Sequence, residues 1–196
     1  MRLIVGNPAE YLVEDEFLDF SGPCVAALAT RFRADHADDV GYTRAVFEYV
    51  RDGIHHAWDV QDPRVTLAAS EVLAAGVGLC YAKSHLFAAL LRGQGIPAGL
   101  CYQILSNDDG RTHVLHGLVA VYLEGGWHRQ DPRGNKPGVS ARFSLREEYL
   151  AWPVRSEFGE LDVAEVFVHP NPGVVAALRG AADSEELYRN GLPSRL

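Results

Sequence analysis

The stretch from Gly76 to Pro97 constrains the fold of this chain more than any other part of the sequence. Its apolar residues recur at spacings of three and four, and this period predicts a helix with one buried face. The residues on that face are Leu79, Ala82, Leu86, Ala89 and Leu90, and Phe87 and Leu91 widen it into a mostly buried helix. Glycines precede the predicted helix, and Gly93, Gly95 and Pro97 end it.

Cys80 lies at the predicted first turn of this helix, directly after the glycine-rich bend. A thiol in that place is close to unpaired backbone N–H groups and to the positive end of the helix dipole, which favours the thiolate and lowers a thiol pKa. The same N–H groups are able to bind an oxyanion, so Cys80 is a candidate nucleophile. The alternative is a small apolar residue buried under the helix, as free cysteines often are.

Length and charge restrict the class of protein. The chain has 196 residues, of which 47% are hydrophobic, and this is enough for one domain with a full core over residues 1–196. Its 18 Lys and Arg residues against 26 Asp and Glu residues give a net charge of −8. Because such an acidic surface repels nucleic acid and anionic membranes, we expect neither as a partner.

The cysteines and the N-terminal residues predict the compartment. Residues 1–10 lack a basic region followed by an apolar run, and no apolar stretch approaches the roughly 20 residues that span a bilayer. Cys24, Cys80 and Cys101 make an odd count without a disulfide framework, which suits free thiols in a reducing compartment. We therefore expect a soluble, cytoplasmic protein, in which Cys24 and Cys101 are packing residues.

Helical spacing precedes the Cys80 segment, and a period near two follows it. Helices are predicted over residues 23–32, 42–54 and 68–75, the last with Thr66 or Ser70 as its N-cap. Strands are predicted over 98–105, 112–123 and 127–130, joined by turns at 107–110 and at Gly125-Gly126. Because these connections are too short for parallel crossovers, we expect an antiparallel meander. Beyond it we predict a helix over 144–151, a strand near 163–168, and helices over 172–179 and 183–189, the last capped by Asp183 or Ser184.

His116 is the candidate base, because a cysteine nucleophile needs an imidazole to take its proton. It lies inside the second predicted strand and shares a face with apolar residues such as Leu118 and Ala120, so its ring needs a polar partner. The alternative is a core histidine that bonds a backbone carbonyl.

Asp131 ends the third predicted strand and is the candidate for orienting the imidazole. If Gly125 and Gly126 form the turn, Asp131 falls opposite Ala120, on the same face as His116. It is then four residues along from His116, which is about 13 Å in a flat ladder. Contact therefore needs twist, a bulge or a chain that curls back at Asp131. The alternative is an aspartate that only begins a turn before proline.

A metal site is the other chemistry that the histidines suggest. His55 and His56 are adjacent, but no paired spacing of further ligands accompanies them. His113 and His116 differ by an odd number, so a regular strand places them on opposite faces. We predict no metal and no cofactor.

Three pieces of the sequence stand in order: GVGLCYAKS at 76–84, HGLVAVYLEGGW at 116–127 and DPR at 131–133. Together they resemble the core of the transglutaminase-like superfamily, whose pattern is a glycine-led cysteine at a helix start, a histidine on a strand and an aspartate before proline after a Gly-Gly-Trp turn. The run LLRGQGIPA at 90–98 is similar to the family's link from the helix to the first sheet strand. The resemblance covers residues of about 45–135, which leaves about 136–196 as an extension.

The resemblance implies an α+β, papain-like fold in which Cys80 is the nucleophile, His116 the base and Asp131 the orienting residue. It also implies that the curvature of the fold brings Asp131 to His116. The chain departs from the family pattern at Leu118 and Ala120, where many members have an aromatic and an acidic residue. Trp58 is the only candidate for an oxyanion-binding side chain upstream of the cysteine, and a structural aromatic is the simpler interpretation.

The expected function is thiol-dependent acyl chemistry on a peptide, protein or small amide, most simply hydrolysis through a thioester. Three alternatives stay open: transfer of the acyl group to an amine, acetyl transfer to an arylamine, and a peptide-binding or protein-binding module without catalysis. The chain has no calcium-loop motif of the kind found in the large cross-linking enzymes, and this favours hydrolysis.

Overall fold

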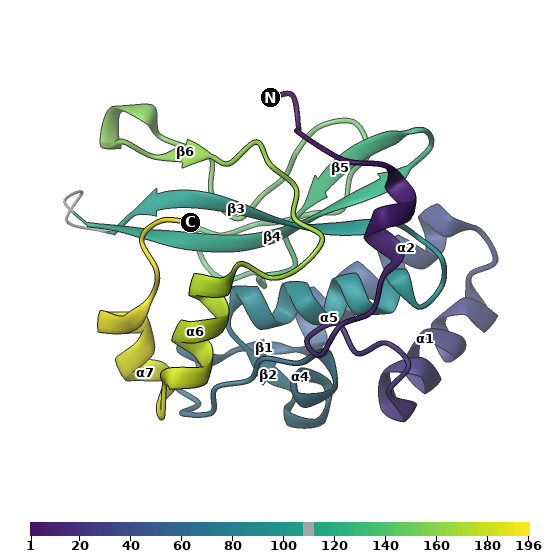
Figure 1. Ribbon diagram of the computed structural model, residues 1–196, viewed down its shortest axis with the longest axis horizontal. Coiled ribbons are helices and arrows are strands. Elements are labelled where there is room, and N and C mark those ends of the chain that lie inside the picture. The colour runs from purple at the N-terminus through teal and green to yellow at the C-terminus, as the bar shows by residue number, and fades with distance from the viewer. Residues whose placement is uncertain (108–111) are drawn as a thin grey trace.

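The computed structural model describes residues 1–107 and 112–196. It confirms the predicted α+β class, because helices pack against a four-stranded antiparallel sheet (Figure 1). The helices are α1 (Pro23–Asp35), α2 (Asp39–Glu48), α3 (Ala57–Val60), α4 (Ala69–Ala75), α5 (Cys80–Arg92), α6 (Pro172–Gly180) and α7 (Ser184–Glu186). The strands are β1 (His55–His56), β2 (Val77–Gly78), β3 (Ala98–Ser106), β4 (His113–Leu123), β5 (Gly126–Gln130) and β6 (Leu161–Asp162). Short turns of other helix types are η1 (Pro8–Leu12), η2 (Tyr49–Gly53), η3 (Ser156–Phe158) and η4 (Leu187–Gly191).

The four-stranded sheet has the order β5–β4–β3–β6, and each strand is antiparallel to its neighbour. β3 and β4 form the longest ladder, in a register that sets Ala98 opposite Val121. β1 and β2 form a separate parallel pair, in which His56 lies opposite Gly78. This pair fixes the segment that leads into Cys80.

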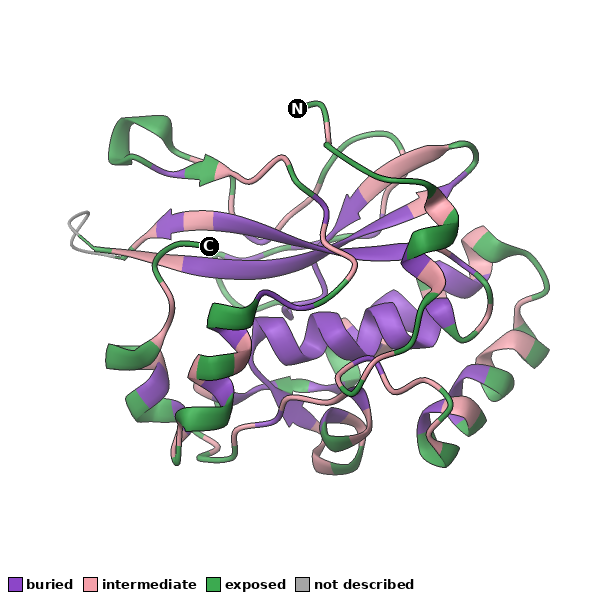
Figure 2. Cartoon of the chain, in the orientation of Figure 1, coloured by how far each residue is buried: buried purple, intermediate pink, exposed green. Residues whose placement is uncertain are grey.

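Helix α5 is the central element, and each of its residues is buried (Figure 2). One face of the sheet packs against it through Val119 and Val121, as the alternation along a strand requires. The opposite face carries Leu118, which packs in one cluster with Tyr11 of the N-terminal segment. The sheet is therefore covered on both faces, and the predicted buried helix is confirmed.

Most elements predicted from periodicity are present with bounds shifted by a few residues. The predicted helices at 23–32 and 68–75 are α1 and α4, and the three predicted strands are β3, β4 and β5. The predicted helix at 42–54 is divided into α2 and the π turn η2. Near the C-terminus, Asp183 accepts the N–H groups of Glu185 and Glu186, so it is the N-cap of α7 as predicted.

The helix predicted over 144–151 is wrong. Its backbone groups bond to other segments instead: the N–H of Ala151 donates to Asp131, and Arg142 pairs with Tyr149. Tertiary hydrogen bonds thus outweigh the local helical spacing, which is a weak preference. The strand near 163–168 is displaced, because the ladder with β3 uses Leu161 and Asp162, and Phe167 makes only a single bridge.

Three smaller predictions differ from the structure. The N-cap of α4 is Ala68 rather than Thr66 or Ser70, and Glu71 reaches back to accept the Ala68 N–H at 3.1 Å. Cys24 is exposed, because the buried side of α1 is formed by other residues, so its prediction as a packing residue is wrong. Most of the turn predicted at 107–110 lies outside the described residues.

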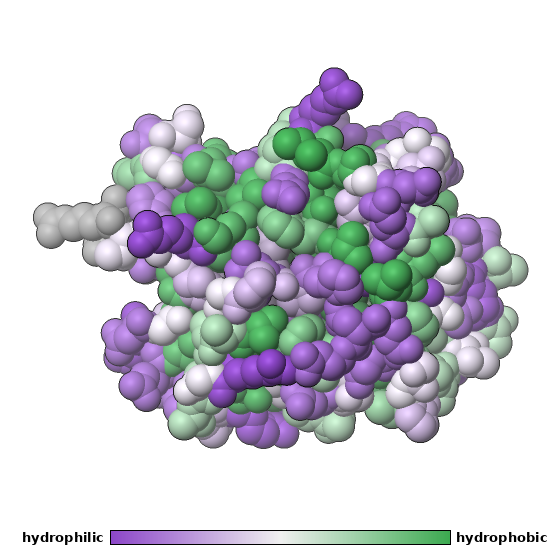
Figure 3. Space-filling view, viewed as in Figure 1, coloured by the Kyte–Doolittle hydropathy of each residue, from purple (hydrophilic) through white to green (hydrophobic). Residues whose placement is uncertain are grey.

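The surface is mixed in polarity. Figure 3 shows apolar side chains gathered over the half of this face that contains the sheet. Exposed apolar residues include Ile4 and Val13 near the N-terminus and Leu161 in β6. Within the described part of the chain, every helix is too short or too polar to cross a bilayer.

Arg92, at the end of α5, joins three segments of the chain. Its buried guanidinium donates hydrogen bonds of 2.8, 2.8 and 2.7 Å to the carbonyl oxygens of Ala98, Val13 and Val168. A buried charge is tolerated only when its donors are paired, and these carbonyls have no water to replace it. Arg92 therefore holds the N-terminal segment and the chain after β6 against the central helix.

We expect Arg92→Ala to lower the free energy of unfolding by about 3 kcal/mol or more, because it leaves buried carbonyls unpaired. Arg146→Ala, at an exposed arginine, is the control and should change it by less than about 0.5 kcal/mol. Urea denaturation followed by circular dichroism measures both values. Equal effects of the two substitutions would contradict the role given to Arg92.

Candidate active site

Cys80 is the first residue of α5, as the sequence predicts. Gly76 has a left-handed backbone with φ of 66°, and β2 then leads to Leu79, the N-cap, whose apolar side chain offers no acceptor. The first N–H groups of α5 are therefore not capped by that side chain. They point toward the site with the positive end of the helix dipole, which favours negative charge there.

The turn between β4 and β5 corrects the predicted register. The turn residues are Glu124 and Gly125, with φ of 50° and 80°, rather than Gly125 and Gly126. Two successive positive φ angles are typical of the two-residue hairpin turn whose twist matches that of the strands. Leu123 consequently pairs with Gly126.

This register moves Asp131 toward His116. β5 ends with Gln130 opposite Val119, so the next residue, Asp131, comes level with Leu118 rather than with Ala120. The shift is two residues, which keeps Asp131 on the predicted face and halves the separation along the strand to about 7 Å. The position of the turn therefore accounts for most of the separation between His116 and Asp131 that the sequence left unexplained.

His116 and Asp131 are joined by a hydrogen bond of 2.8 Å between Nε2 and Oδ2. Both side chains are buried, and Asp131 also accepts the backbone N–H groups of Arg133 at 3.1 Å and Ala151 at 2.9 Å. The partner of His116 is thus a fixed carboxylate and not a backbone carbonyl. Because Asp131 occupies Nε2, Nδ1 is the nitrogen left for the thiol.

The electrostatics of this pair favour a charged imidazole. Burial by itself lowers the pKa of His116, but the charge and hydrogen bond of Asp131, helped by the hydrogen bond with Cys80, raise it to about 10. Burial raises the pKa of Asp131, and the His116 charge with three hydrogen bonds outweighs this and lowers it. The site therefore holds an imidazolium between a carboxylate and a thiol near neutral pH.

The Cys80 thiol is held between β4 and α5. Sγ accepts the backbone N–H of Gly117 at 3.5 Å, and the thiol also contributes to the raised pKa of His116. A Cβ at Gly117 would lie 2.8 Å from Cδ1 and 3.2 Å from Cα of Tyr81, so only glycine allows the first turn of α5 to come this close to the strand. The sequence analysis did not identify Gly117, although a glycine inside an apolar strand indicates a close approach of backbone.

An aromatic side chain and a group of charged side chains lie beside the imidazole. The Trp152 ring meets the His116 ring edge to face, with centroids 5.0 Å apart, and the Arg133 guanidinium lies 5.2 Å from the Trp152 ring. Arg133 in turn forms a two-bond ion pair with Asp59, which also accepts Lys136 at 2.9 Å. These residues keep water from the His116–Asp131 bond, and the sequence analysis gave no role to any of them.

Lys83 is buried one turn after Cys80. Burial, and next the charge of Arg133, lower its pKa to about 7. Its ammonium donates to the carbonyl oxygens of Arg51, at 3.2 Å, and Ile54. Lys83 thus ties the segment before β1 to the helix that carries the thiol.

Neither His56 nor His113 is hydrogen-bonded to this network among the described residues, although His56 is near enough for the charge of Arg133 to affect its pKa. His56 is buried, burial lowers its pKa well below 6.5, and its Nδ1 has no hydrogen-bond partner among the described residues. His113 bonds the Phe158 carbonyl oxygen at 2.8 Å. Across residues 1–107 and 112–196, no three His, Cys, Asp or Glu side chains are grouped so as to hold a metal ion.

The remaining residues that the sequence analysis named pack against other side chains of the protein. Trp58 stacks on Tyr188, with centroids 4.3 Å apart. Leu118 and Ala120, at the positions where the family pattern differs, are fully buried with Cys101, whose pKa burial raises to about 12.

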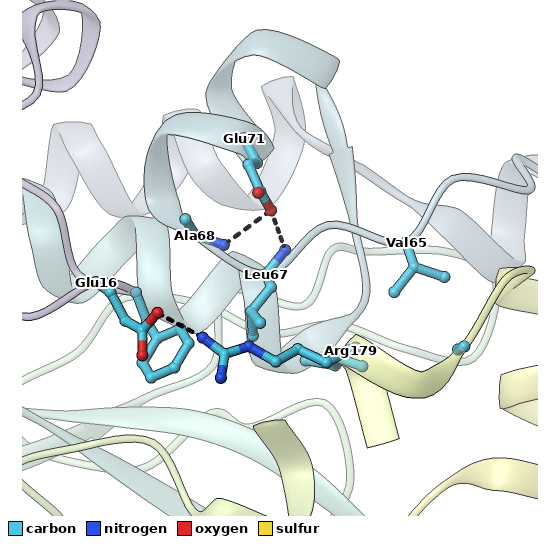
Figure 4. Close-up of a pocket in the computed structure, with 9 residues that line it drawn as sticks. Glu16, Val65, Leu67, Ala68, Glu71 and Arg179 are labelled. Carbon is cyan, nitrogen blue, oxygen red and sulfur yellow. Dashed lines mark hydrogen bonds and ion pairs between the residues drawn. The ribbon is translucent and has the colours of Figure 1, made fainter. Parts of the chain in front are cut away.

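One surface pocket lies away from this site. It measures about 320 Å³ and lies between the N-terminal segment, the start of α4 and α6 (Figure 4). Its polar groups are paired, because Glu71 accepts the N–H of Leu67 at 2.9 Å and Arg179 forms an ion pair with Glu16. We locate the candidate site by the thiol, imidazole and carboxylate rather than by this hollow.

A comparison with known protein families covers the part of the chain that contains Cys80, His116 and Asp131. A family model described as "Transglutaminase-like superfamily" matches residues 26–132. The search of curated proteins found no match.

Solved structures show a likeness of fold. A candidate cysteine protease from Cytophaga hutchinsonii has a TM-score of 0.50 at 15% identity, over 66% of this chain and 43% of that one. The periplasmic domain of TgpA from Pseudomonas aeruginosa has 0.49 at 23% identity, over 65% and 48%. A structure described as a TGase has 0.46 at 17% identity, over 79% and 45%. The chain therefore spans less than half of the length of each of these structures.

We expect Gly117→Ala to separate the thiol from β4, because the added methyl group meets the Tyr81 backbone and ring. It should slow alkylation of Cys80 by iodoacetamide at neutral pH by about tenfold or more and lower the free energy of unfolding by about 1–3 kcal/mol. Gly180→Ala, where a Cβ would meet nothing within 4 Å, is the matched control and should change neither. Unchanged alkylation in Gly117→Ala would contradict the close approach.

The pKa of His116 gives a second prediction. Since it is raised from 6.5 to about 10, the stability it contributes is complete below about pH 6.5 and is lost as pH rises toward 10. Asp131→Asn removes the carboxylate charge, so His116 should lose its proton at lower pH and this part of the pH dependence should shrink. ¹⁵N NMR titration of the imidazole and urea denaturation between about pH 6 and 10 measure the two effects. Asp38→Asn, at the N-cap of α2, is the control.

Proposed function

Because the chain belongs to the transglutaminase-like superfamily, we propose that it is an enzyme that transfers acyl groups through the thiol of Cys80. The observation that carries the proposal is that the thiol at the start of α5 interacts with His116 strongly enough to raise the pKa of the imidazole, and His116 is bonded at 2.8 Å to the buried Asp131. A packing cysteine needs no such partners, and an orienting carboxylate behind an imidazole is what a thiol nucleophile requires.

The proposed reaction has two halves. The Cys80 thiolate attacks the carbonyl carbon of an amide, and the backbone N–H of Cys80 donates to the oxygen that becomes negative. His116 gives its proton to the leaving amine, so the amine departs and a thioester remains. His116 then takes a proton from water, the hydroxyl adds to the thioester carbon, and the acid leaves with Cys80 restored as a thiolate. Asp131 holds the imidazole orientation throughout.

Hydrolysis is the outcome that we favour over transfer to an amine. In transfer, a primary amine replaces water in the second half and the product is a new amide. The two are separated by supplying a peptide amide with and without a primary amine and identifying the products by mass spectrometry. The substrate is proposed to be a peptide, a protein or a small amide. Asp131 and His116 serve the reaction at the acyl carbon, and they do not distinguish one substrate side chain from another.

The thiol chemistry also supports a proposal for the compartment. Cys80 acts only as a free thiol, and a reducing compartment such as the cytoplasm keeps thiols free. The cytoplasmic location stays a prediction.

Alkylation tests the thiol before any substrate is known. An ordinary exposed thiol loses on the order of 100-fold in alkylation rate between about pH 8.5 and pH 6, because its thiolate disappears. We expect Cys80 to lose less than about tenfold over the same range, since a positive charge beside a thiol favours the reactive thiolate. Peptide mass spectrometry measures each cysteine separately, so exposed Cys24 and buried Cys101 are controls within the same sample.

The His116→Ala variant completes this experiment. Its Cys80 should follow the steep pH dependence of Cys24, because the positive partner is gone. A Cys80 profile that is steep in the wild type, or the same in both proteins, would favour a binding module without catalysis.

Turnover should depend on the same residues. On a peptide or acyl substrate found with a panel of electrophilic probes, we expect Cys80→Ala to abolish turnover and His116→Ala to lower kcat/KM by about 100-fold or more. Cys24→Ala is the control and should keep full activity. Turnover by Cys80→Ala would exclude the thiol mechanism.

A further inference from the structure

Three different parts of the chain lie one after another along the edge of β4 that is beside the thiol. β5 pairs with this edge only as far as Val119. Two residues earlier, the N–H of Gly117 donates to the Cys80 sulfur. Two residues before that, the N–H of Leu115 donates to the carbonyl oxygen of Pro193 at 2.7 Å. Alternate residues of a strand direct their N–H groups to the same edge, so Pro193 takes the ladder position next to the thiol.

The chain before Pro193 also covers the start of α5. Leu178 of α6 and Leu187 of η4 are buried in one cluster with Cys80 and Tyr81. In Figure 1 the yellow end of the chain rises from α7 and lies along the sheet beside β4. Leu192 also packs against this cluster, and Cys80 within it is only 9% exposed, although the proposed chemistry requires a substrate carbon at its sulfur.

Residues 187 and 192–196 are attached very differently. Leu187 is 4% exposed and part of the core. By contrast, residues 194–196 are exposed, Leu192 and Pro193 are only partly buried, and the Leu115–Pro193 bond is the backbone hydrogen bond that ties them to the sheet within the described residues. One such bond and partial burial make a weak attachment.

Proline also makes residues 192–196 a poor strand. Pro193 has no N–H, so it accepts one hydrogen bond from β4 and donates none in return. An extended polypeptide with an N–H at this position is able to accept the same bond and also to donate to the Leu115 carbonyl oxygen, which now accepts the Tyr81 hydroxyl and has a second lone pair. Such a polypeptide has an advantage over residues 192–196 for the same edge.

We propose that residues 192–196 are an autoinhibitory strap that occupies the β4 edge at Leu115, where an extended polypeptide substrate must pair to bring its acyl carbon to Cys80. The strap is displaced when the substrate binds. This inference rests on the function proposed for Cys80, since it assigns the regulation of that site.

Removal of the strap is the test. A protein that ends at Gly191 should have Cys80 alkylated by iodoacetamide at pH 7 at least about threefold faster than the full chain, with Cys24 unchanged, because access to the sulfur increases. Its KM for a peptide amide should fall by a similar factor, and kcat should change little. The peptide Leu-Pro-Ser-Arg-Leu, added to the shortened protein, should slow alkylation again.

A second variant keeps every residue of the strap. Leu192→Asp places a charge on the partly buried residue and should reproduce the faster alkylation, whereas Leu196→Asp, at a residue 45% exposed, should not. Thermal melting shows that each variant is folded. Equal Cys80 alkylation in the full chain, the shortened protein and Leu192→Asp overturns the strap, and it does so whether or not the protein turns over peptides. Faster alkylation without turnover in any form supports the strap and contradicts the proposed function.

Discussion

The contact between the first turn of α5 and the backbone of β4 is the constraint on which the rest of the structure depends. It brings the Cys80 sulfur within 3.5 Å of the Gly117 N–H and beside the His116 ring, and it exists because residue 117 has no side chain. The helix is then held in this position by polar groups along its length. Lys83 binds the segment before β1, His85 bonds the Leu67 carbonyl oxygen, and Arg92 joins segments at the other end. Burying polar and charged side chains costs free energy, so these residues stabilise a fully buried helix only because each is hydrogen-bonded to another segment.

The sequence was sufficient for the parts of the fold that local patterns control. The period of three and four located α5 and the period of two located β3, β4 and β5, because each pattern is set by the geometry of its own element. The order of cysteine, histidine and aspartate motifs was sufficient to identify the family that the family model also matches. The chain from 144 to 151 was mispredicted because its backbone groups bond to Asp131 and other distant residues, which no local pattern records.

The distance between His116 and Asp131 shows how one turn decides a site. Choosing Gly125-Gly126 for the turn, as glycine content suggests, kept the correct face but placed the two residues twice as far apart along the ladder. The structure instead uses Glu124 at φ of 50°, a conformation that a glutamate rarely adopts. The parts contributed by Trp152, Arg133 and residues 192–196 were not predictable in this way, because they come from segments outside the motif and reach the site only through tertiary packing.

The full burial of α5 has a consequence for how such a protein diversifies. The nucleophile cannot be moved by tilting the helix, since its polar residues are anchored to several separate segments at once. Evolution, or a laboratory redesign of selectivity, is therefore confined to the surrounding loops and the chain that follows β6. The catalytic residues are thus inherited as a rigid unit, and substrate preference changes through the segments that surround them.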